Sequence, residues 1–423
     1  MTEPESPRSA PRTPPGLGAV FLVIFLDILG FSLVLPFLAA EARRAFGTSE
    51  LTGTLLASIY SVMQFLFVPV WGRVSDRIGR RPVLLWSIVA TGLGMTALGL
   101  AIVRAESVFW LFVARAASGV ATANLGTASA YIADVTPPEE RTRGMGLIGV
   151  AFGLGFIIGP AIGGGLSPIE IAGRKGAVPC FVAAALSIVN FGWAFLRLRE
   201  SLPPERRAVS HRSLMPLNLD AAREALSRPG IGAAVLVNFV AVTSFTVLDQ
   251  TFRFYNEDLF SMTELDTGLV LMFIGLVAAG VQGGLVRPLS RRYSEAPLVR
   301  AGALLQAVAF AGYVAAPAFG RWALYVAGSV LAIGNGLATP SIASYISKRA
   351  DPTAQGSTLG TNQSASALAR VFGPGLGGWL YGAFDKRAPY VVAALGMTLA
   401  SVVALSLRRS DEADQRKTST QTS

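Results

Sequence analysis

Long apolar runs follow one another along almost the whole chain, and short polar segments separate them. Each run approaches the ~20 residues that an α-helix needs to cross the ~30 Å hydrocarbon core of a bilayer. A soluble protein would interrupt such runs far more often. The pattern therefore predicts an all-α membrane protein with twelve transmembrane helices: Gly16–Ala40, Leu51–Trp71, Pro82–Val103, Ser107–Ile132, Gly144–Leu166, Ala177–Leu196, Gly230–Phe252, Thr267–Val286, Pro297–Phe319, Trp322–Ile346, Gly356–Phe384 and Ala388–Leu407.

A polar segment divides these runs into two groups of six. We interpret it as a solvated cytoplasmic tether with one short amphipathic helix around 220–226, because it is too short to be a domain. The first run is too long for a cleaved signal peptide and contains Asp27, so it counts as a span. The expected organisation is a tail (1–15), an N-terminal six-helix bundle (16–196), a linker (197–229), a C-terminal six-helix bundle (230–407) and a second tail (408–423).

The two halves of the chain repeat each other. Tyr131-Ile132 recurs as Tyr345-Ile346 and Gly159-Pro160 as Gly373-Pro374, each time 214 residues later. Unrelated coincidences would not share one spacing. Six-helix repeats related by an axis along the membrane normal, with substrate bound between them, are an established transporter plan. We therefore expect two bundles related by pseudo-two-fold symmetry.

The charge pattern indicates topology. The net charge is +10, but the basic residues lie in short loops between apolar runs, so they do not form a nucleic-acid-binding surface. The larger share of Lys and Arg lies on the side that carries both termini and the linker, and this side is expected to be cytoplasmic. Because Arg, Ala and Gly are favoured, we expect a multi-pass protein of the cytoplasmic (inner) membrane of a bacterium.

Metal and thiol chemistry have little support. Cys180 is the only cysteine and His211 the only histidine, so the chain has no internal disulfide and no His/Cys cluster for a metal. No His, Cys or Ser constellation stands at membrane depth. We expect neither an enzyme nor a bound cofactor.

Four charged residues lie well inside the apolar runs: Asp27, Arg115, Asp249 and Arg370. Each costs roughly +2.5 to +3.5 kcal/mol in the centre of a membrane-spanning helix, and such residues usually face a bundle interior and mark a substrate or proton path.

The loop after the second run has an unusual spacing of Gly, Asp and Arg. Two glycines permit tight turns, and Asp76 and Arg80 can pair with each other and with Asp134. A plain positive-inside loop explains the arginines but not the spacing. The residues concerned are Gly72, Asp76, Arg77, Gly79, Arg80 and Arg81.

This loop resembles the signature of the major facilitator superfamily of transporters. The resemblance implies that Gly72, Asp76, Arg77, Gly79, Arg80 and Asp134 form a conformational switch. In it, Asp76 would dock on the positive N-terminus of the eleventh helix and latch the outward-open state.

The fifth run resembles the motif of the family's drug/proton antiporters, as found in the tetracycline-resistance and multidrug branch. The residues are Gly155, Gly159, Pro160, Gly163 and Gly164. This motif favours export. The alternative is ordinary packing, because Gly lets helices approach closely and Pro bends them.

Asp27 is the candidate proton site. It lies about 15 Å into the first helix, near mid-membrane, and Arg115 lies within about one turn of that depth on the fourth. The segment Arg115–Gly119 resembles the family's fourth-helix signature, whose Arg is tied to proton transfer. We expect Asp27 and Arg115 to couple transport to protons; the alternative is a permanent ion pair.

Uncharged polar residues in the runs mark a candidate substrate cavity, together with one of the charges. Asp249 is either a contact at the cavity mouth or an interfacial ion pair with Arg253. Arg370 is assigned a structural role near Gly373-Pro374. The cavity set is Gln64, Asn124, Asp249, Asn335 and Asn362.

The predicted function is proton-coupled efflux of amphipathic or lipophilic small molecules. The third and ninth runs carry no acidic residue and the eighth carries no His. The family's exporters of metal–tetracycline complexes use such groups, so the resemblance does not extend to tetracycline as the expected substrate. The alternatives are a proton-coupled importer of a nutrient and a non-transporting sensor or scaffold. The expected partners are a small-molecule substrate, protons and the lipid bilayer, without nucleic acid, and the expected state is a monomer.

Overall fold

In this computed structural model, residues 17–421 are described, except for 105, 137–140, 203–222, 224–225, 229 and 351–354. The N-terminal tail and most of the linker, with its expected short helix, lie outside the described residues. The rest is almost entirely helical, as the apolar runs predict. Among the described residues, ten helices are long and apolar enough to cross a membrane.

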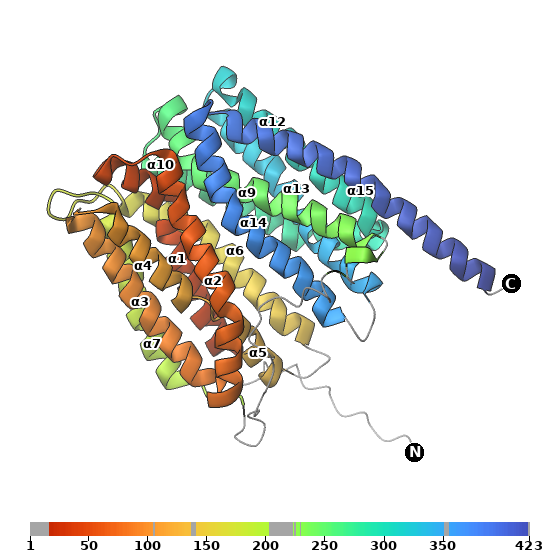
Figure 1. Ribbon diagram of the computed structural model, residues 1–423, viewed down its shortest axis with the longest axis horizontal. Coiled ribbons are helices and arrows are strands. Elements are labelled where there is room, and N and C mark those ends of the chain that lie inside the picture. The colour runs from red at the N-terminus through yellow and green to blue at the C-terminus, as the bar shows by residue number, and fades with distance from the viewer. Residues whose placement is uncertain are drawn as a thin grey trace, which may run out of the picture.

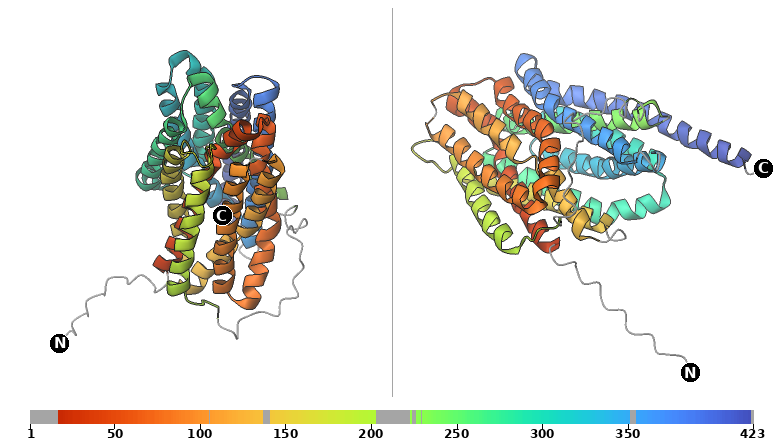
Figure 2. Two further views of the ribbon diagram at one scale, coloured as in Figure 1. Left: turned by 90° about the vertical axis from the view of Figure 1, so that its left-hand side faces the viewer. Right: turned by 60° about the horizontal axis from the view of Figure 1, so that its bottom comes forward.

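The helices form two bundles that lie side by side (Figure 1, Figure 2). The N-terminal bundle contains α1 (Leu17–Phe46), α2 (Glu50–Ile78), α3 (Arg80–Arg104), α4 (Val108–Ala121), α5 (Leu125–Val135), α6 (Arg141–Leu166) and α7 (Ala177–Arg197). The C-terminal bundle contains α9 (Ile231–Phe260), α10 (Glu264–Gly280), η3 (Val281–Leu285), α11 (Val286–Arg292), α12 (Glu295–Phe319), α13 (Trp322–Arg349), α14 (Gln355–Ala383) and α15 (Ala388–Gln421).

The repeat extends to helix length. Both α1 and α9 have 30 residues, and α2 and its counterpart from Glu264 to Arg292 both have 29. The helices are longer than the apolar runs, so their polar ends project beyond the hydrocarbon core. Two predicted spans, which correspond to α6 and α14, are not among the ten. In α6, only Gly153–Leu166 counts as an apolar helix. In α14, the first half is rich in Ser, Thr, Asn and Gln.

The fourth span is broken. The sequence predicts one helix over Ser107–Ile132, but α4 ends at Ala121 and α5 begins at Leu125. Near the break, Ser118 Oγ donates to Ala114 O (2.8 Å) and Thr122 Oγ1 to Ser118 O (2.9 Å). Such hydroxyl back-bonding competes with the helical ladder and bends helices. At the break, Gln64 Nε2 of α2 donates to Thr122 O (3.4 Å), and Trp71 Nε1 donates to Val120 O (2.7 Å).

The molecule has two ends, which we name by their residues. The N-terminal face carries Leu17 and the turn at Gly79 between α2 and α3, and the distal face carries Phe46 at the end of α1. Between the bundles, α2 packs against α14 and α6 against α10. These contacts are tight toward the distal face: a Cβ on Gly378 would lie 2.1 Å from Thr54 Oγ1, and one on Gly268 2.4 Å from Pro160 O.

The same seams are open toward the N-terminal face. Gly72 lies about five helical turns after Thr54 on α2, and Gly360 lies about five turns before Gly378 on α14. Gly72 is therefore on the same side of α2 as Thr54, and Gly360 is on the same side of α14 as Gly378. A Cβ added at Gly72 or Gly360, or at Gly153 on the α6 seam, would meet no atom of the described residues within 4 Å. The bundles therefore touch in their distal halves and part toward the N-terminal face. We call the space between them, bounded by these three glycines, the crevice.

Candidate functional site

Asp27 lies on α1 beside the break between α4 and α5. Its carboxyl shares a side-chain hydrogen bond with Asn124, the N-cap residue of α5. Asn124 Nδ2 in turn donates to Ser87 Oγ (2.6 Å) on α3. The other carboxyl oxygen, Oδ1, is buried and has no hydrogen-bond partner in the described chain. A buried charge without full hydrogen bonding is costly, and a proton removes that cost.

Arg115 is placed differently from the sequence-based expectation. Its side chain is 1% exposed, its Nε donates to Leu56 O (3.3 Å), and its guanidinium lies 4.3 Å above the ring of Tyr60. Among the described residues, no ion pair joins Arg115 to Asp27, so the alternative of a permanent ion pair is not supported. Sequence spacing gives the depth of a residue in a helix, but not the side on which its partner lies.

Tyr60 connects the charged groups. Thr122 Oγ1, at the helix break, and the Tyr60 hydroxyl share a hydrogen bond (2.6 Å), and Gln64 Nε2 reaches the Tyr60 oxygen at 3.5 Å. The ring stacks on Phe31 at 5.0 Å between centroids. Arg115, Asp27 and Arg370 are all close enough to Tyr60 to interact with it electrostatically. Sequence reasoning missed Tyr60, because a tyrosine in an apolar run resembles a core residue; its spacing of four from Gln64 was the available signal.

The remaining predicted cavity residues are dispersed. Asn335 Oδ1 accepts from Thr339 on its own helix (3.0 Å). Asn362 is buried and its Oδ1 has no partner in the described chain. Asp249 Oδ2 accepts from Gln250 Nε2 (2.6 Å). Asp249 makes no ion pair with Arg253 in the described part of the molecule, so the interfacial-pair alternative is not supported.

Arg370 is exposed on α14. A structural role near Gly373-Pro374 would require its guanidinium to bond carbonyls that Pro374 leaves free, or a facing side chain. Within the described residues it makes neither a hydrogen bond nor an ion pair. The structure therefore provides no support for that role.

The signature loop forms a charge cluster at the N-terminal face. Arg80 Nη1 lies 2.6 Å from Asp76 Oδ1, and its Nε lies 3.4 Å from Asp134 Oδ2. Gly79 has φ 107°, and a Cβ there would lie 2.3 Å from Glu200 Oε2. Arg77 lies in the last turn of α2.

Glu200 was not anticipated. Its carboxylate follows α7 and accepts from the backbone N–H groups of Arg80 (2.8 Å) and Arg81 (3.2 Å), which start α3. It therefore caps α3 and ties the linker to the signature loop. A lone Glu after an apolar run gives no such signal.

The glycine motif of α6 packs helices. A Cβ on Gly155, Gly159 or Gly163 would collide with Ile28, Ser32 or Leu33 of α1, at 2.6, 1.9 and 2.1 Å. The neighbouring Gly164 instead faces α10, where a Cβ would lie 2.4 Å from Glu264 O, and Pro160 O approaches Gly268 of the same helix. One side of α6 therefore fits α1, and the other forms the distal part of the seam.

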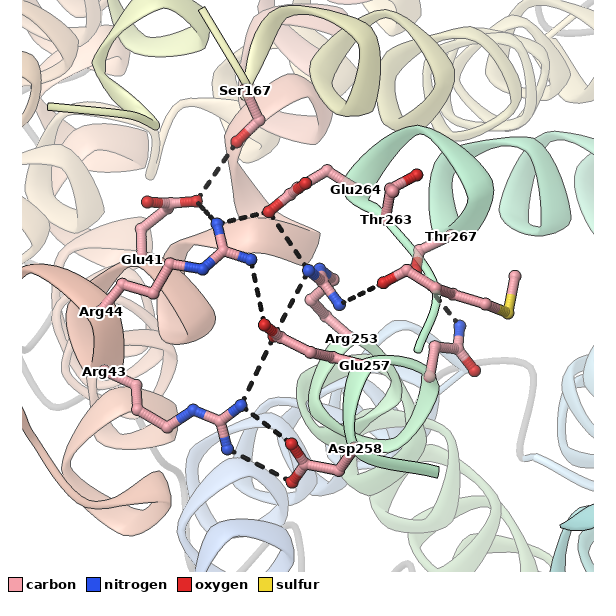
Figure 3. A network of polar contacts seen from close by, with 12 residues as sticks. Glu41, Arg43, Arg44, Ser167, Arg253, Glu257, Asp258, Thr263, Glu264 and Thr267 are labelled. Carbon is pink, nitrogen blue, oxygen red and sulfur yellow. Dashed lines mark hydrogen bonds and ion pairs between the residues drawn. The ribbon is translucent and has the colours of Figure 1, made fainter. Parts of the chain in front are cut away.

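A network of ion pairs closes the distal face between the bundles (Figure 3). Arg43 Nη2 of α1 lies 3.1 Å from Asp258 Oδ1 of α9, and Arg44 Nη2 lies 3.2 Å from Glu257 Oε1. Arg44 also pairs with Glu264 of α10. We call this network the distal gate; its members are Glu41, Arg43, Arg44, Glu50, Arg253, Glu257, Asp258 and Glu264.

The distal gate follows the internal repeat. Arg43 and Glu257 are 214 residues apart, which is the spacing of the repeat, so they occupy equivalent positions in the two halves. Equivalent positions meet where the pseudo-two-fold axis passes. Opposite charges at these positions make the two halves complementary at the axis.

The comparisons with known proteins agree with this architecture. The Major Facilitator Superfamily matches the chain over residues 20–374 and again over 288–423. The tetracycline resistance protein, class C, of Escherichia coli is 32% identical over 391 residues, covering 91% of this chain and 94% of that protein. Major facilitator superfamily domain-containing protein 10 of Homo sapiens is 31% identical over 421 residues, covering 86% and 87%.

A solved structure is also similar. The crystal structure of the human organic anion transporter MFSD10 has a TM-score of 0.70 and 25% identity, and the match covers 93% of this chain and all of that chain. The signature loop, the glycine motif of α6 and the paired bundles thus occur in one chain whose relatives are transporters. This protein belongs to the major facilitator superfamily, in the branch of the tetracycline resistance proteins.

Proposed function

We propose that the protein exports amphipathic small molecules in exchange for protons. The observation that carries this proposal is the Asp27 carboxyl beside a broken helix, with one buried oxygen that has no hydrogen-bond partner among the described residues. Relatives named for tetracycline resistance support export, and the organic anion transporter supports an organic solute. Arg115 acts on Asp27 indirectly, through Tyr60, which lies near both.

The proposed orientation places the N-terminal face in the cytoplasm, as the positive-inside rule expects. The crevice then opens to the cytoplasm and the distal gate closes the outer side. Export requires the distal gate to part while Gly72 and Gly360 come together. Asp76, on the crevice side of α2, would then dock on the start of α14 and latch that state.

The test is Asp27→Asn in everted membrane vesicles with an acidified lumen. Addition of ciprofloxacin to the wild type should make the lumen more alkaline, because protons leave as ligand enters. The variant should lose this response by about tenfold or more, since Asn cannot release a proton at any accessible pH. The measurement is the fluorescence of a pH-sensitive dye in the lumen.

The matched control is Lys348→Gln, which removes one charge from an exposed ion pair inside the C-terminal bundle. It should respond as the wild type does. An undiminished response in Asp27→Asn, at equal membrane content, would reject the role of Asp27. A proton-linked importer would leave the lumen acidic in the wild type, because ligand added outside cannot drive it in this direction.

A further inference from the structure

Arg370 faces the crevice. On α14, Gly377 packs on α9 near Val247, and Gly378 packs on α2 at Thr54. At 3.6 residues per turn, Arg370 lies on the strip between these two sides. Phe372 and Trp379 lie on the opposite side and are 60% and 48% exposed, as expected for a side that faces lipid. Figure 1 shows α14 running between α9 and α2.

The Arg370 guanidinium is therefore a cation at membrane depth without a protein counter-charge in the described chain. Such a charge is expensive in hydrocarbon and is normally paired or placed in a water-filled path. Gln363 is two turns earlier on the same strip and is also exposed. A planar guanidinium with free donors suits the bidentate binding of a carboxylate or a similar anion.

Asp249 is partly exposed on α9 and lies on the same side of that helix as Arg253. Thr243, Thr246 and Val247 occupy the side of α9 that touches α14. Asp249 lies off that side, one turn before Arg253, which reaches across to the distal gate. Because Gly377 is level with Val247, Asp249 lies about 13 Å nearer the distal face than Arg370. Its only hydrogen bond in the described part of the chain comes from Gln250.

We propose that Asp249 and Arg370 form the two poles of the ligand site, and that the ligand is dipolar. Its anionic group binds Arg370 and its cationic group binds Asp249, about 13 Å away along the molecule. Tyr60 and Phe31, on the opposite bundle, supply an aromatic wall for the body of the ligand. This assignment rests on the proposed function only in taking the crevice as the transport path.

Three fluorescent ligands test the two poles separately. Ciprofloxacin carries a carboxylate and a piperazinium, its methyl ester carries only the cation, and its N-acetyl derivative carries only the anion. Their affinities for the detergent-purified protein are measured by fluorescence titration. Ciprofloxacin should bind about tenfold or more tightly than either derivative, which corresponds to one charge-assisted contact.

The variants should discriminate among the ligands. Arg370→Gln should weaken ciprofloxacin and the N-acetyl derivative by about tenfold and leave the ester unchanged; Asp249→Asn should weaken ciprofloxacin and the ester and leave the N-acetyl derivative unchanged. Arg370→Lys keeps the charge and should show a smaller loss, confined to ligands with a carboxylate. Arg300→Gln, the same exchange on α12 within its own bundle, should change nothing.

Equal loss of all three ligands in Arg370→Gln would overturn the proposal, because the residue would then support the fold. Equal wild-type affinity for ciprofloxacin and its ester would also overturn it. If the ligand pattern fails while the vesicle lumen still becomes alkaline, only the ligand class is wrong. If the pattern holds without alkalinisation, the site stands and proton-coupled export is wrong.

Discussion

Neutralising Asp258 should open the distal gate. In Asp258→Asn, the guanidinium of Arg43 loses contacts of 3.1 and 3.3 Å to the two carboxylate oxygens. Removing one partner of a fully buried pair costs about 3–5 kcal/mol, and roughly 2–3 kcal/mol is appropriate here because the partners are partly exposed and so partly screened. The population of the state with an open distal seam should rise about 30-fold or more.

A cysteine at Thr54 reports this change. Thr54 is fully buried in the seam against Gly378, so it should react with a membrane-impermeant maleimide only when the seam parts. Cys180→Ala removes the only other thiol. The labelling rate of Thr54→Cys in whole cells should rise about 30-fold with Asp258→Asn.

The control and the second partner make the test specific. Lys348→Gln breaks an exposed ion pair within one bundle and should leave the labelling rate unchanged. The double variant Arg43→Gln, Asp258→Asn should raise the labelling rate by less than the product of the two single effects. The reason is that both partners of the ion pair are then removed together. Unchanged labelling in Asp258→Asn would show that the ion pairs do not hold the seam.

Filling the open half of the seams should stop transport. Gly72→Leu or Gly360→Leu places a bulky side chain where a Cβ meets no described atom within 4 Å. The present conformation accommodates the change, and Leu favours a helix over Gly by roughly 0.5–1 kcal/mol. When the bundles close toward the N-terminal face, the added Leu side chain would overpack the seam. Transport should therefore fall about 100-fold, while ligand binding remains.

Proteoliposome transport and ligand titration are measured on the same preparations. Gly192→Leu on α7 is the matched control, since a Cβ there also meets nothing within 4 Å but α7 packs inside the N-terminal bundle. It should transport normally. Normal transport by Gly72→Leu and Gly360→Leu would mean that these halves never close on each other.

The sequence was a good guide to the architecture because hydrophobicity and repetition act locally. The apolar runs located the helices. The repeat marked by Tyr131 and Tyr345 predicts equivalent halves, and α1 and α9 do have equal lengths. The fourth span was predicted as continuous, because the back-bonding of Ser118 and Thr122 is a local competition that hydrophobicity does not register.

The site was less accessible to sequence reasoning because its contacts are long-range. In the sequence, Arg43 and Arg44 are simply two basic residues after an apolar run, yet each pairs with residues of the other bundle. Arg115 was placed at the correct depth for Asp27, but its side chain turns to Tyr60. Depth follows from counting residues, whereas the facing partner depends on how the helices rotate and pack.

The central claim is that Asp27 holds a proton which ligand binding displaces. Infrared difference spectroscopy of the purified protein measures this directly, because a protonated carboxyl has a C=O stretch that a carboxylate lacks. On addition of ciprofloxacin at a concentration that saturates each protein, the wild type and Asp249→Asn should both lose such a band, and Asp27→Asn should show no loss. A band that still disappears in Asp27→Asn, or that is missing from the wild type, would contradict the account.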